Sequence, residues 1–322
     1  MKKLRIIFMG TPEFAVSSLK ILVENNYNVA GVVTTPDKPA GRGQKIRQSA
    51  VKEYAIERNI AILQPDNLKD TDFIKSLKEL NPDIQIIVAF RMLPEAVWKI
   101  PEYGTFNLHA SLLPQYRGAA PINWAIINGE SVTGVTTFFI DNKIDTGNII
   151  FQEKVSINET DNAEMLHDKL MNKGAELVKK TVDAIENKNI NIINQKELIK
   201  DINNLKNAPK IFKDDCKIDW NKSVKNIYNL IRGLSPYPGA WTEFISKDNK
   251  IMLLKIFSSE IISIRHNQKI GTFQTNNKDY LKVFVKNACI SIKELQVSGK
   301  KRLKIDEFLR GFKGIENFTV NL

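Results

Sequence analysis

Short apolar runs alternate with helix-like segments through the first half of this chain, and this alternation restricts the possible folds more than any other feature. Apolar runs of strand length cover residues 3–9, 29–34 and 84–90, and segments with helical periodicity, such as residues 12–24, separate them. Strands connected through helices pair in parallel, because a parallel pair needs a crossover connection. We therefore predict an α/β fold with a doubly wound sheet.

The same pattern predicts where a ligand would bind. In open α/β sheets, ligands lie beyond the carboxyl ends of the strands. The residues that follow Met9, Thr34, Phe90 and His109 are therefore the first candidates for a functional site.

The rest of the chain is organised differently. A hairpin-like pair of segments at residues 134–140 and 148–157 precedes a helical segment at residues 162–187. An Asn- and Lys-rich tract follows, which we interpret as a linker. Beyond it, short alternating segments between Asn, Lys and Gly clusters predict a small all-β barrel or sandwich. We place the first domain at residues 1–188, the linker at 189–208 and the second domain at 209–322.

The positive charge of the chain is concentrated in its C-terminal part. The net charge of +11 comes entirely from residues 206–322, which hold 22 Lys and Arg against 11 Asp and Glu, whereas residues 1–205 are neutral. A charge that served solubility alone would be expected on both halves. We therefore expect the second domain to bind a polyanion.

The cysteines and the apolar runs limit the class of protein. Cys216 and Cys289 form no CxxC motif and have no His nearby, so they indicate neither a zinc site nor a disulfide framework. No apolar run approaches the roughly 18 residues of a membrane span, and the run at residues 6–9 is too short for a secretory signal. We expect a cytoplasmic, metal-independent protein that is a monomer.

The turn after the first strand tests a dinucleotide-binding alternative. Such a module would have GxGxxG at this point and an acidic residue about 20 positions later. Gly10 is a single glycine, so this alternative loses most of its support. We expect Thr11 to cap the following helix and Pro12 to be its first residue.

The segment TTPDKPAGRGQKIR, residues 34–47, has no apolar face to bury and must be exposed. Its prolines stiffen it, and its cations include Lys38, Arg42 and Lys45. Contact with phosphate is one interpretation, and a solvated charged loop is an equally good one for this segment alone.

The strand at residues 105–109 carries the most specific signal. Asn107 and His109 are two residues apart and project to the same side of a strand. Asp145 lies in a Gly-containing loop after a later strand. An amide and a protonated imidazole can stabilise an oxyanion, and a carboxylate can orient the imidazole and help to move a proton. Because no Ser or Cys nucleophile accompanies them, this set favours acyl transfer by direct attack of the substrate's amine.

These motifs carry a resemblance. NLHASLLPQYRGAAPINWAI and TGVTTFFIDNKIDTGNI resemble the folate-dependent formyltransferase family, and MGTPEFAV, TTPDKPAGRGQK and SPYPGAWT resemble its branch that acts on methionyl-tRNA. The similarity covers most of residues 3–160 and recurs at 232–242, in the family's order.

The resemblance implies a Rossmann-like catalytic domain and a β-barrel of the oligonucleotide-binding type. It implies 10-formyltetrahydrofolate as the formyl donor and methionyl initiator tRNA as the acceptor, for translation initiation. Asn107 and His109 match the oxyanion-binding pair and Asp145 the proton-handling carboxylate. The residues that the resemblance places at the folate are Ser111, Leu112, Leu113, Pro114, Phe90 and Asp141, and those that it places at the tRNA are Lys38, Arg42 and Lys45.

Two dipeptides depart from the family's pattern without removing a catalytic group. Phe90-Arg91 stands where Tyr-Gly is usual, and Asn142-Lys143 stands where small residues are common. The main alternative is a sugar-nucleotide formyltransferase that uses the same donor and can also carry a C-terminal barrel. The basic loop and the uneven charge favour tRNA. A non-catalytic RNA-binding protein would explain the basic half but not the three polar groups together.

Overall fold

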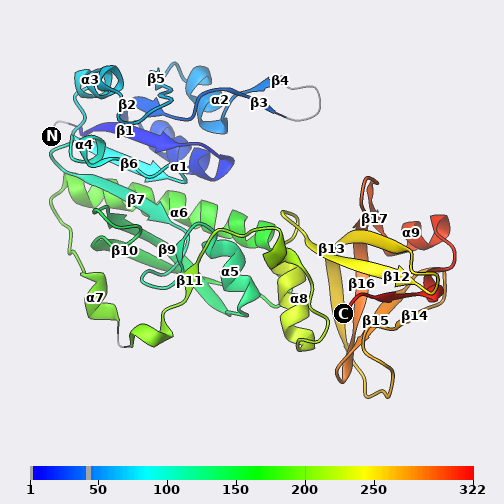
Figure 1. Ribbon diagram of the computed structural model, residues 1–322. Coiled ribbons are helices and arrows are strands. Elements are labelled where there is room, and N and C mark those ends of the chain that lie inside the picture. The colour runs from blue at the N-terminus through cyan, green and yellow to red at the C-terminus, as the bar shows by residue number, and fades with distance from the viewer. Residues whose placement is uncertain (1–2, 41–44, 200) are drawn as a thin grey trace. The chain divides into compact units, whose positions relative to one another are not determined.

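The computed structural model describes residues 3–40, 45–199 and 201–322, and the chain forms two compact units (Figure 1). The first unit comprises Met1–Ala119, Val132–Ser156 and His167–Ala208, and the second comprises Ala120–Ser131, Ile157–Leu166 and Pro209–Leu322. Among the described residues, no helix combines the length and the apolarity that crossing a membrane requires.

A seven-stranded sheet forms the centre of the first unit, with the strand order β10-β9-β7-β6-β1-β2-β5. The strands are β1 Arg5–Gly10, β2 Asn28–Val33, β5 Ile62–Leu63, β6 Ile84–Val88, β7 Thr105–His109, β9 Val132–Phe139 and β10 Ile149–Ser156. The five strands from β7 to β5 pair in parallel, and β9 runs antiparallel to both β7 and β10. The predicted doubly wound sheet and its added hairpin are confirmed.

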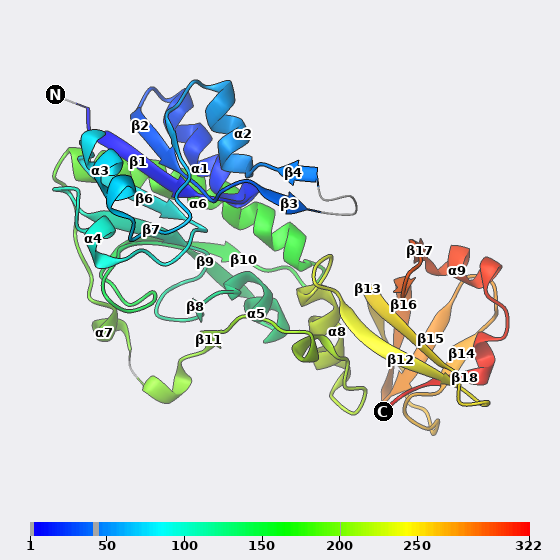
Figure 2. The ribbon, with the colours of Figure 1, turned by 45° about the horizontal axis from the view of Figure 1, so that its top comes forward.

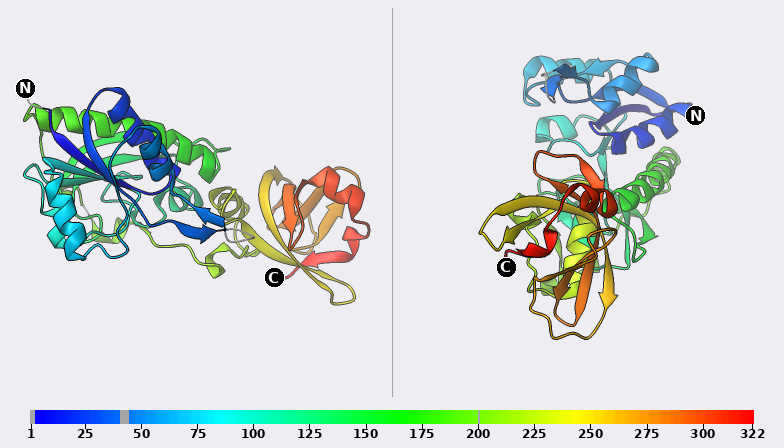
Figure 3. Two further views of the ribbon diagram at one scale, coloured as in Figure 1. Left: turned by 90° about the horizontal axis from the view of Figure 1, so that it is seen from above. Right: turned by 90° about the vertical axis from the view of Figure 1, so that its right-hand side faces the viewer.

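Helices cover both faces of this sheet. Ile7 and Met9 of β1 pack with Phe73 and Leu77 on one face, and Gly174 contacts Leu108 on the other. Figure 3 shows the helices on the two sides of the sheet in its left-hand view. The helices are α1 Glu13–Glu24, α2 Ala50–Glu57, α3 Thr71–Glu79, α4 Glu95–Trp98 and α6 Ala163–Glu186.

The helix starts follow from local hydrogen bonding. Ser49 caps α2 by accepting from the Lys52 backbone N–H, and Asp70 caps α3 in the same way. Helix α1 begins at Glu13, with Pro12 at the N-cap position and no side-chain cap. The prediction that Thr11 caps this helix is therefore wrong by one residue, because Pro12 has an extended rather than a helical backbone.

The chain between residues 189 and 208 packs on the first unit. It contains α7 Gln195–Leu198, the 3₁₀ turn η1 Ile202–Asn204 and the short strand β11 Asn207–Ala208. Strand β11 pairs in parallel with β8 Arg117–Gly118, a strand that directly follows the predicted catalytic segment. This tract therefore borders the functional residues rather than only connecting two domains.

The second unit is a nearly closed antiparallel barrel, which confirms the predicted all-β fold. Its main strand order is β14-β15-β16-β13-β12-β18, and a bridge between Thr272 and Thr319 brings the two ends of this order together. Trp220 is fully buried in the core of this unit and donates its indole N–H to Thr242 Oγ1 at 2.9 Å. The strands are β12 Ala240–Ser246, β13 Ile251–Ser263, β14 Phe273–Thr275, β15 Leu281–Val285, β16 Ala288–Val297, β17 Arg302–Lys304 and β18 Phe318–Val320. The unit's helices are α5 Pro121–Ile127, α8 Val224–Gly233 and α9 Ile305–Gly311, with the 3₁₀ turns η2 Asp214–Cys216 and η3 Ile315–Asn317.

Candidate active site

His109 is the last residue of β7, and its imidazole is buried and fixed in orientation. Its Nε2 lies 2.8 Å from the backbone oxygen of Tyr116. A carbonyl oxygen can only accept a hydrogen bond, so Nε2 carries a hydrogen and donates it. The other ring nitrogen, Nδ1, lies 3.7 Å from Asp145 Oδ2 and is left to exchange a proton.

Asp145 lies in the loop after β9, where the sequence predicts a functional carboxylate. Its Oδ2 accepts a hydrogen bond from the Gly118 backbone N–H at 2.9 Å, which holds the carboxylate beside His109. The backbone of Asp145 has a φ of 55°, in the left-handed region that is uncommon outside glycine. The predicted pairing of His109 with Asp145 is therefore present in the structure.

Asn107 projects from β7 on the same side as His109. Leu108, between them, packs against α6 on the opposite face of the sheet, so strand alternation places both polar side chains away from α6. Among the described residues, the Asn107 side chain has no hydrogen-bond partner, although it is only partly exposed. The Asn107 amide, two residues from the fixed imidazole of His109, is therefore a suitable hydrogen-bond donor for a substrate oxygen.

Asp141, a predicted folate-binding residue, stabilises the loop that carries Asp145. Its carboxylate accepts from the Thr146 hydroxyl at 2.7 and 3.0 Å and from the Lys143 backbone N–H at 2.9 Å. The loop is therefore held by its own hydrogen bonds, although Asn142 and Lys143 stand where small residues are common in the family that the sequence resembles.

Two glycines allow the chain to approach closely at this site. A Cβ on Gly118 would lie 2.4 Å from the Ala208 backbone oxygen, and Gly118 has a φ of 125°. A Cβ on Gly147 would lie 1.7 Å from the Phe139 backbone oxygen. Neither position has room for a larger residue, so both glycines are required where β8 meets β11 and where the Asp145 loop turns back.

Gln195 is a buried polar residue that the sequence reasoning missed. Its Nε2 donates to the backbone oxygens of Asp145 and Gly147 at 3.0 and 2.7 Å. The nearby Arg117 guanidinium is partly buried, which lowers its pKa, while the negative charges of Asp145 and Asp141 act in the opposite direction. No local motif marks Gln195, because its partners are about 50 residues earlier in the chain.

The turn after His109 is mostly buried. Ser111 Oγ donates to the Gln115 backbone oxygen at 2.6 Å, and the Leu113 backbone N–H donates to Thr136 Oγ1 at 3.2 Å. Of the four predicted folate-side residues in this turn, Ser111, Leu113 and Pro114 are buried and Leu112 is partly exposed. Of these four side chains, only that of Leu112 therefore offers surface to a ligand.

Phe90 follows β6 and is partly buried. The Arg91 guanidinium lies 5.4 Å from the centre of the Phe90 ring, and it donates to the backbone oxygens of Pro65 and Asp66 at 2.8 and 3.0 Å. Arg91 thus connects the end of β6 to a neighbouring loop and covers the ring of Phe90.

The predicted tRNA-binding loop includes a short hairpin, β3 Lys38–Ala40 paired with β4 Lys45–Arg47, which projects from the first unit (Figure 2). Lys38 is exposed, and Arg42 lies outside the described residues. At the base of the hairpin, hydrogen bonds from Lys52 and then Gln64 lower the pKa of Asp37. Because this pKa is lowered, the ionised Asp37 carboxylate stabilises the folded state fully above about pH 4. This stabilisation is lost only in more acid solution, where the carboxylate becomes protonated.

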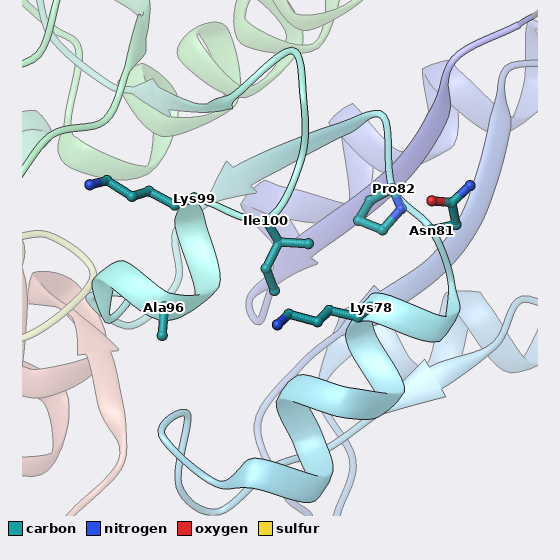
Figure 4. Close-up of a pocket in the computed structure, with 6 residues that line it drawn as sticks. All are labelled: Lys78, Asn81, Pro82, Ala96, Lys99 and Ile100. Atoms are coloured by element: carbon teal, nitrogen blue, oxygen red, sulfur yellow. The ribbon is translucent and has the colours of Figure 1, made fainter.

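A hollow of about 410 Å³ lies away from these groups, between α3 and α4, and is lined by Lys78 and Lys99 among others. Figure 4 shows the Lys99 side chain extending away from the other residues of the hollow. Lys99 also pairs with Glu95. Because the two ammonium groups do not converge, this hollow does not form an anion site.

Sequence comparisons agree with the two-unit organisation. Residues 2–182 match the family model described as formyl transferase, and residues 210–313 match the model described as formyl transferase, C-terminal domain. The chain is 56% identical to the methionyl-tRNA formyltransferase of Bacteroides thetaiotaomicron over 100% of both chains. It is 54% identical to that of Flavobacterium johnsoniae over 97% of both chains.

Solved structures show the same fold at lower identity. A sugar 3N-formyl transferase, determined in the presence of dTDP and 5-N-formyl-THF, has a TM-score of 0.63 and 24% identity, with 94% of this chain and 100% of that chain covered. The N-formyltransferase of Helicobacter canadensis, in complex with folinic acid and dTDP-3-aminofucose, has a TM-score of 0.62 and 22% identity, with 90% and 98% covered.

Proposed function

Because this chain belongs to the formyl transferase family, we propose that it transfers the formyl group of 10-formyltetrahydrofolate to the free amino group of methionyl initiator tRNA, for translation initiation. The observation that carries this proposal is the identity of 54–56% along the whole chain to methionyl-tRNA formyltransferases. The grouping of His109 with Asp145 beside the unpartnered Asn107 supports the same reaction.

The donor supplies an activated formyl carbon, and the residues of this chain fit a carbonyl group. The Asn107 amide has no hydrogen-bond partner among the described residues and can donate to the formyl oxygen. As the amine of methionine adds to the carbon, negative charge develops on this oxygen and the Asn107 bond strengthens. A donor of this kind contributes about 2.7–4 kcal/mol to transition-state stabilisation.

The pair formed by His109 and Asp145 handles the proton of the attacking amine. Since the Tyr116 oxygen keeps a hydrogen on Nε2, His109 Nδ1 accepts the proton that the amine loses. The resulting imidazolium faces Asp145 Oδ2 and adds positive charge near the formyl oxygen. His109 then returns the proton to the nitrogen of the donor as the bond between that nitrogen and the formyl carbon breaks. One C–N bond is thereby replaced by another.

We further propose that the folate lies against the turn of Ser111, Leu112, Leu113 and Pro114, near Phe90 and the Asp141 loop. The partial exposure of Leu112 supports this placement, because its side chain offers apolar surface to a flat ring. Lys38, Arg42 and Lys45 would contact the acceptor end of the tRNA. We propose residues 1–188 as the catalytic domain and 209–322 as the tRNA-binding domain.

The three proposed catalytic groups come from one chain, so a monomer suffices for the proposed reaction. The compartment that we propose is the cytoplasm, which holds the acceptor, methionyl initiator tRNA. The test is formyl transfer to charged initiator tRNA, beside the same tRNA with a fully paired acceptor end and an amino-sugar nucleotide. We expect transfer only to the first. Transfer to the amino-sugar nucleotide alone would replace this proposal with the sugar-nucleotide reaction.

A further inference from the structure

The Gln115 side chain joins the turn after His109 to a segment far along the chain. Its Nε2 donates to the Asn204 backbone oxygen at 3.2 Å, and its Oε1 accepts from the Lys206 backbone N–H at 2.8 Å. The neighbouring Tyr116 backbone N–H donates to the Lys206 oxygen at 2.6 Å. Strands β8 and β11 continue this pairing (Figure 2). The turn is therefore held by backbone groups that lie 89 and 91 residues later than Gln115.

Tyr116 has a backbone conformation that its surroundings must hold. Its φ is 59°, in the left-handed region that is unfavourable for a residue with a Cβ. Such a residue persists only where the structure around it restrains it on both sides. The turn supplies one restraint, since the Ser111 hydroxyl donates to the Gln115 backbone oxygen at 2.6 Å. The Gln115 side chain and the Lys206 backbone supply further restraints from outside the turn.

The direction of the Tyr116 carbonyl decides which ring nitrogen of His109 carries the hydrogen. Its oxygen accepts from Nε2 at 2.8 Å, whereas Nδ1 faces Asp145 Oδ2 at 3.7 Å. These two oxygens compete, because a carboxylate favours a hydrogen on the nitrogen that faces it. If the Tyr116 carbonyl turned away, the hydrogen would move to Nδ1. A nitrogen that already carries a hydrogen cannot accept the proton of an attacking amine.

We propose that Gln115 is a positioning residue, which fixes the Tyr116 carbonyl against residues 204–206 and so keeps His109 in the tautomer that can accept a proton. This inference rests on the proposed function for the role of His109. Gln115 acts through Tyr116, since its amide bonds to the backbone of Asn204 and Lys206. Part of the tract 189–208, which the sequence alone predicts to be a linker, thereby has a task in catalysis.

The first test needs no substrate. Nitrogen NMR of protein with isotope-labelled histidine distinguishes the two neutral tautomers at about pH 8.5, and the chain has three His. Wild-type His109 should carry its hydrogen on Nε2, and its signals are assigned by their loss in His109→Gln. In Gln115→Ala the form with hydrogen on Nδ1 should become the major one, because a hydrogen bond to a carboxylate is roughly twice as strong as one to a neutral acceptor.

His266 provides an internal control in the same spectra. Its Nε2 also donates to a backbone oxygen, that of Val285 at 2.8 Å, and its Nδ1 accepts from the Gln268 backbone N–H at 3.1 Å. It should therefore keep its tautomer in every variant. A change at both His109 and His266 would indicate general loss of structure instead of a local effect and would overturn the inference.

Kinetics measure the consequence for turnover. In Gln115→Ala, kcat should fall in proportion to the tautomer that remains competent, about tenfold, while both KM values stay near those of the wild type. Gln115→Glu keeps the acceptor for the Lys206 N–H but cannot donate to Asn204, so its kcat and its tautomer ratio should lie between those of the other two proteins. The matched control is Gln296→Ala, which removes an amide that donates to the Lys300 backbone oxygen at 2.8 Å and should match the wild type.

The outcomes separate this inference from the proposed function. A wild-type His109 tautomer in Gln115→Ala overturns the inference, whether or not kcat falls, because the turn then holds Tyr116 by itself. If Gln115→Ala does not fold, a wild-type tautomer in Gln115→Glu overturns it in the same way. If the tautomer changes as expected but the wild type formylates no tRNA, the proposed function fails and Gln115 still positions His109.

Discussion

Gln195 accepts two hydrogen bonds from Arg117 through one oxygen, from Nε at 3.1 Å and from Nη2 at 2.6 Å. The amide nitrogen of the same side chain holds the backbone of Asp145 and Gly147, so one buried residue couples the strand β8 to the catalytic loop. Gly118, next to Arg117, in turn donates to the Asp145 carboxylate. The position of Asp145 is therefore set at both its backbone and its side chain.

Replacing Gln195 should misplace Asp145. Gln195→Glu can still accept from Arg117 but can no longer donate to the two backbone oxygens. We expect turnover to fall about 100-fold, because small displacements of a reacting group are costly. Tm should fall as well, because two backbone oxygens lose their donor. Steady-state kinetics with both substrates saturating, beside thermal unfolding, measure the two effects. Glu197→Ala, on an exposed neighbour, is the control. Wild-type turnover in Gln195→Glu would show that these hydrogen bonds serve folding alone.

Asn107→Ala should lower turnover by roughly two or more orders of magnitude, the usual loss for an oxyanion donor. Because the Asn107 side chain has no partner among the described residues, its removal should leave the free energy of unfolding almost unchanged. His109→Ala should cost similar turnover and also stability, since it removes the hydrogen bond from the buried imidazole to the Tyr116 oxygen. Turnover and denaturant unfolding of both variants provide the check. A fully active Asn107→Ala protein removes this residue from the mechanism.

The two carboxylates of the catalytic loop should have different effects. Asp145→Asn removes the negative charge that faces His109, so we expect turnover to fall about 100-fold or more. Asp141→Asn keeps an oxygen that can accept from Thr146, so we expect only a small loss. Single-turnover rates at saturating donor compare the two variants directly. The opposite order of effects would make Asp141 the proton-handling residue.

Gly118→Ala should destabilise the protein and reduce turnover together. The added methyl group would lie 2.4 Å from the Ala208 oxygen, so β8 and β11 must separate and the Gly118 N–H must leave Asp145. We expect a loss of about 1–3 kcal/mol in unfolding free energy. Gly311→Ala in α9 is the matched control, because nothing lies within 4 Å of its Cβ position. Equal stability of the two variants would contradict the close approach at Gly118.

Arg42→Ala should reduce the discrimination between initiator and other charged tRNAs. A cation on a loop stiffened by prolines can contact a defined feature of the acceptor end, whereas the exposed Lys300 and Lys301 supply only general attraction to phosphate. The kcat/KM ratio for the two kinds of tRNA should therefore fall for Arg42→Ala but not for a variant with Lys300 and Lys301 neutralised. Unchanged selectivity in Arg42→Ala would reduce this loop to a solvated surface segment.

The sequence predicted the sheet well because its central strands are buried on both faces and appear as continuous apolar runs, as in β1, where residues 6–9 are all apolar and buried. It also singled out His109, which ends β7 at the edge where ligands are expected. Asp145 was singled out by its Gly-containing loop, because β9 runs antiparallel to β7 and ends at the opposite edge. Helix α8 was not predicted, although Ser223 and the apolar spacing of Ile227 and Ile231 mark it. That signal was available locally.

Gln195 could not be found in this way. It lies in a tract rich in Asn and Lys, and nothing in its neighbourhood distinguishes it from exposed amides. Its burial depends on Arg117, which is 78 residues away in the chain. Long-range polar pairing has no periodicity, so local patterns of hydrophobicity do not contain it.

The pairing of β8 with β11 has a consequence for synthesis on the ribosome. Gly118 is made well before Ala208, and at about 5–20 residues per second the roughly 90 intervening residues take about 5–20 s. During that time the growing chain contains the residues of its parallel strands but lacks the partner that completes β8 and the amide that fixes Asp145. The contacts that fix the Asp145 loop can therefore form only after the residues up to Ala208 have left the exit tunnel.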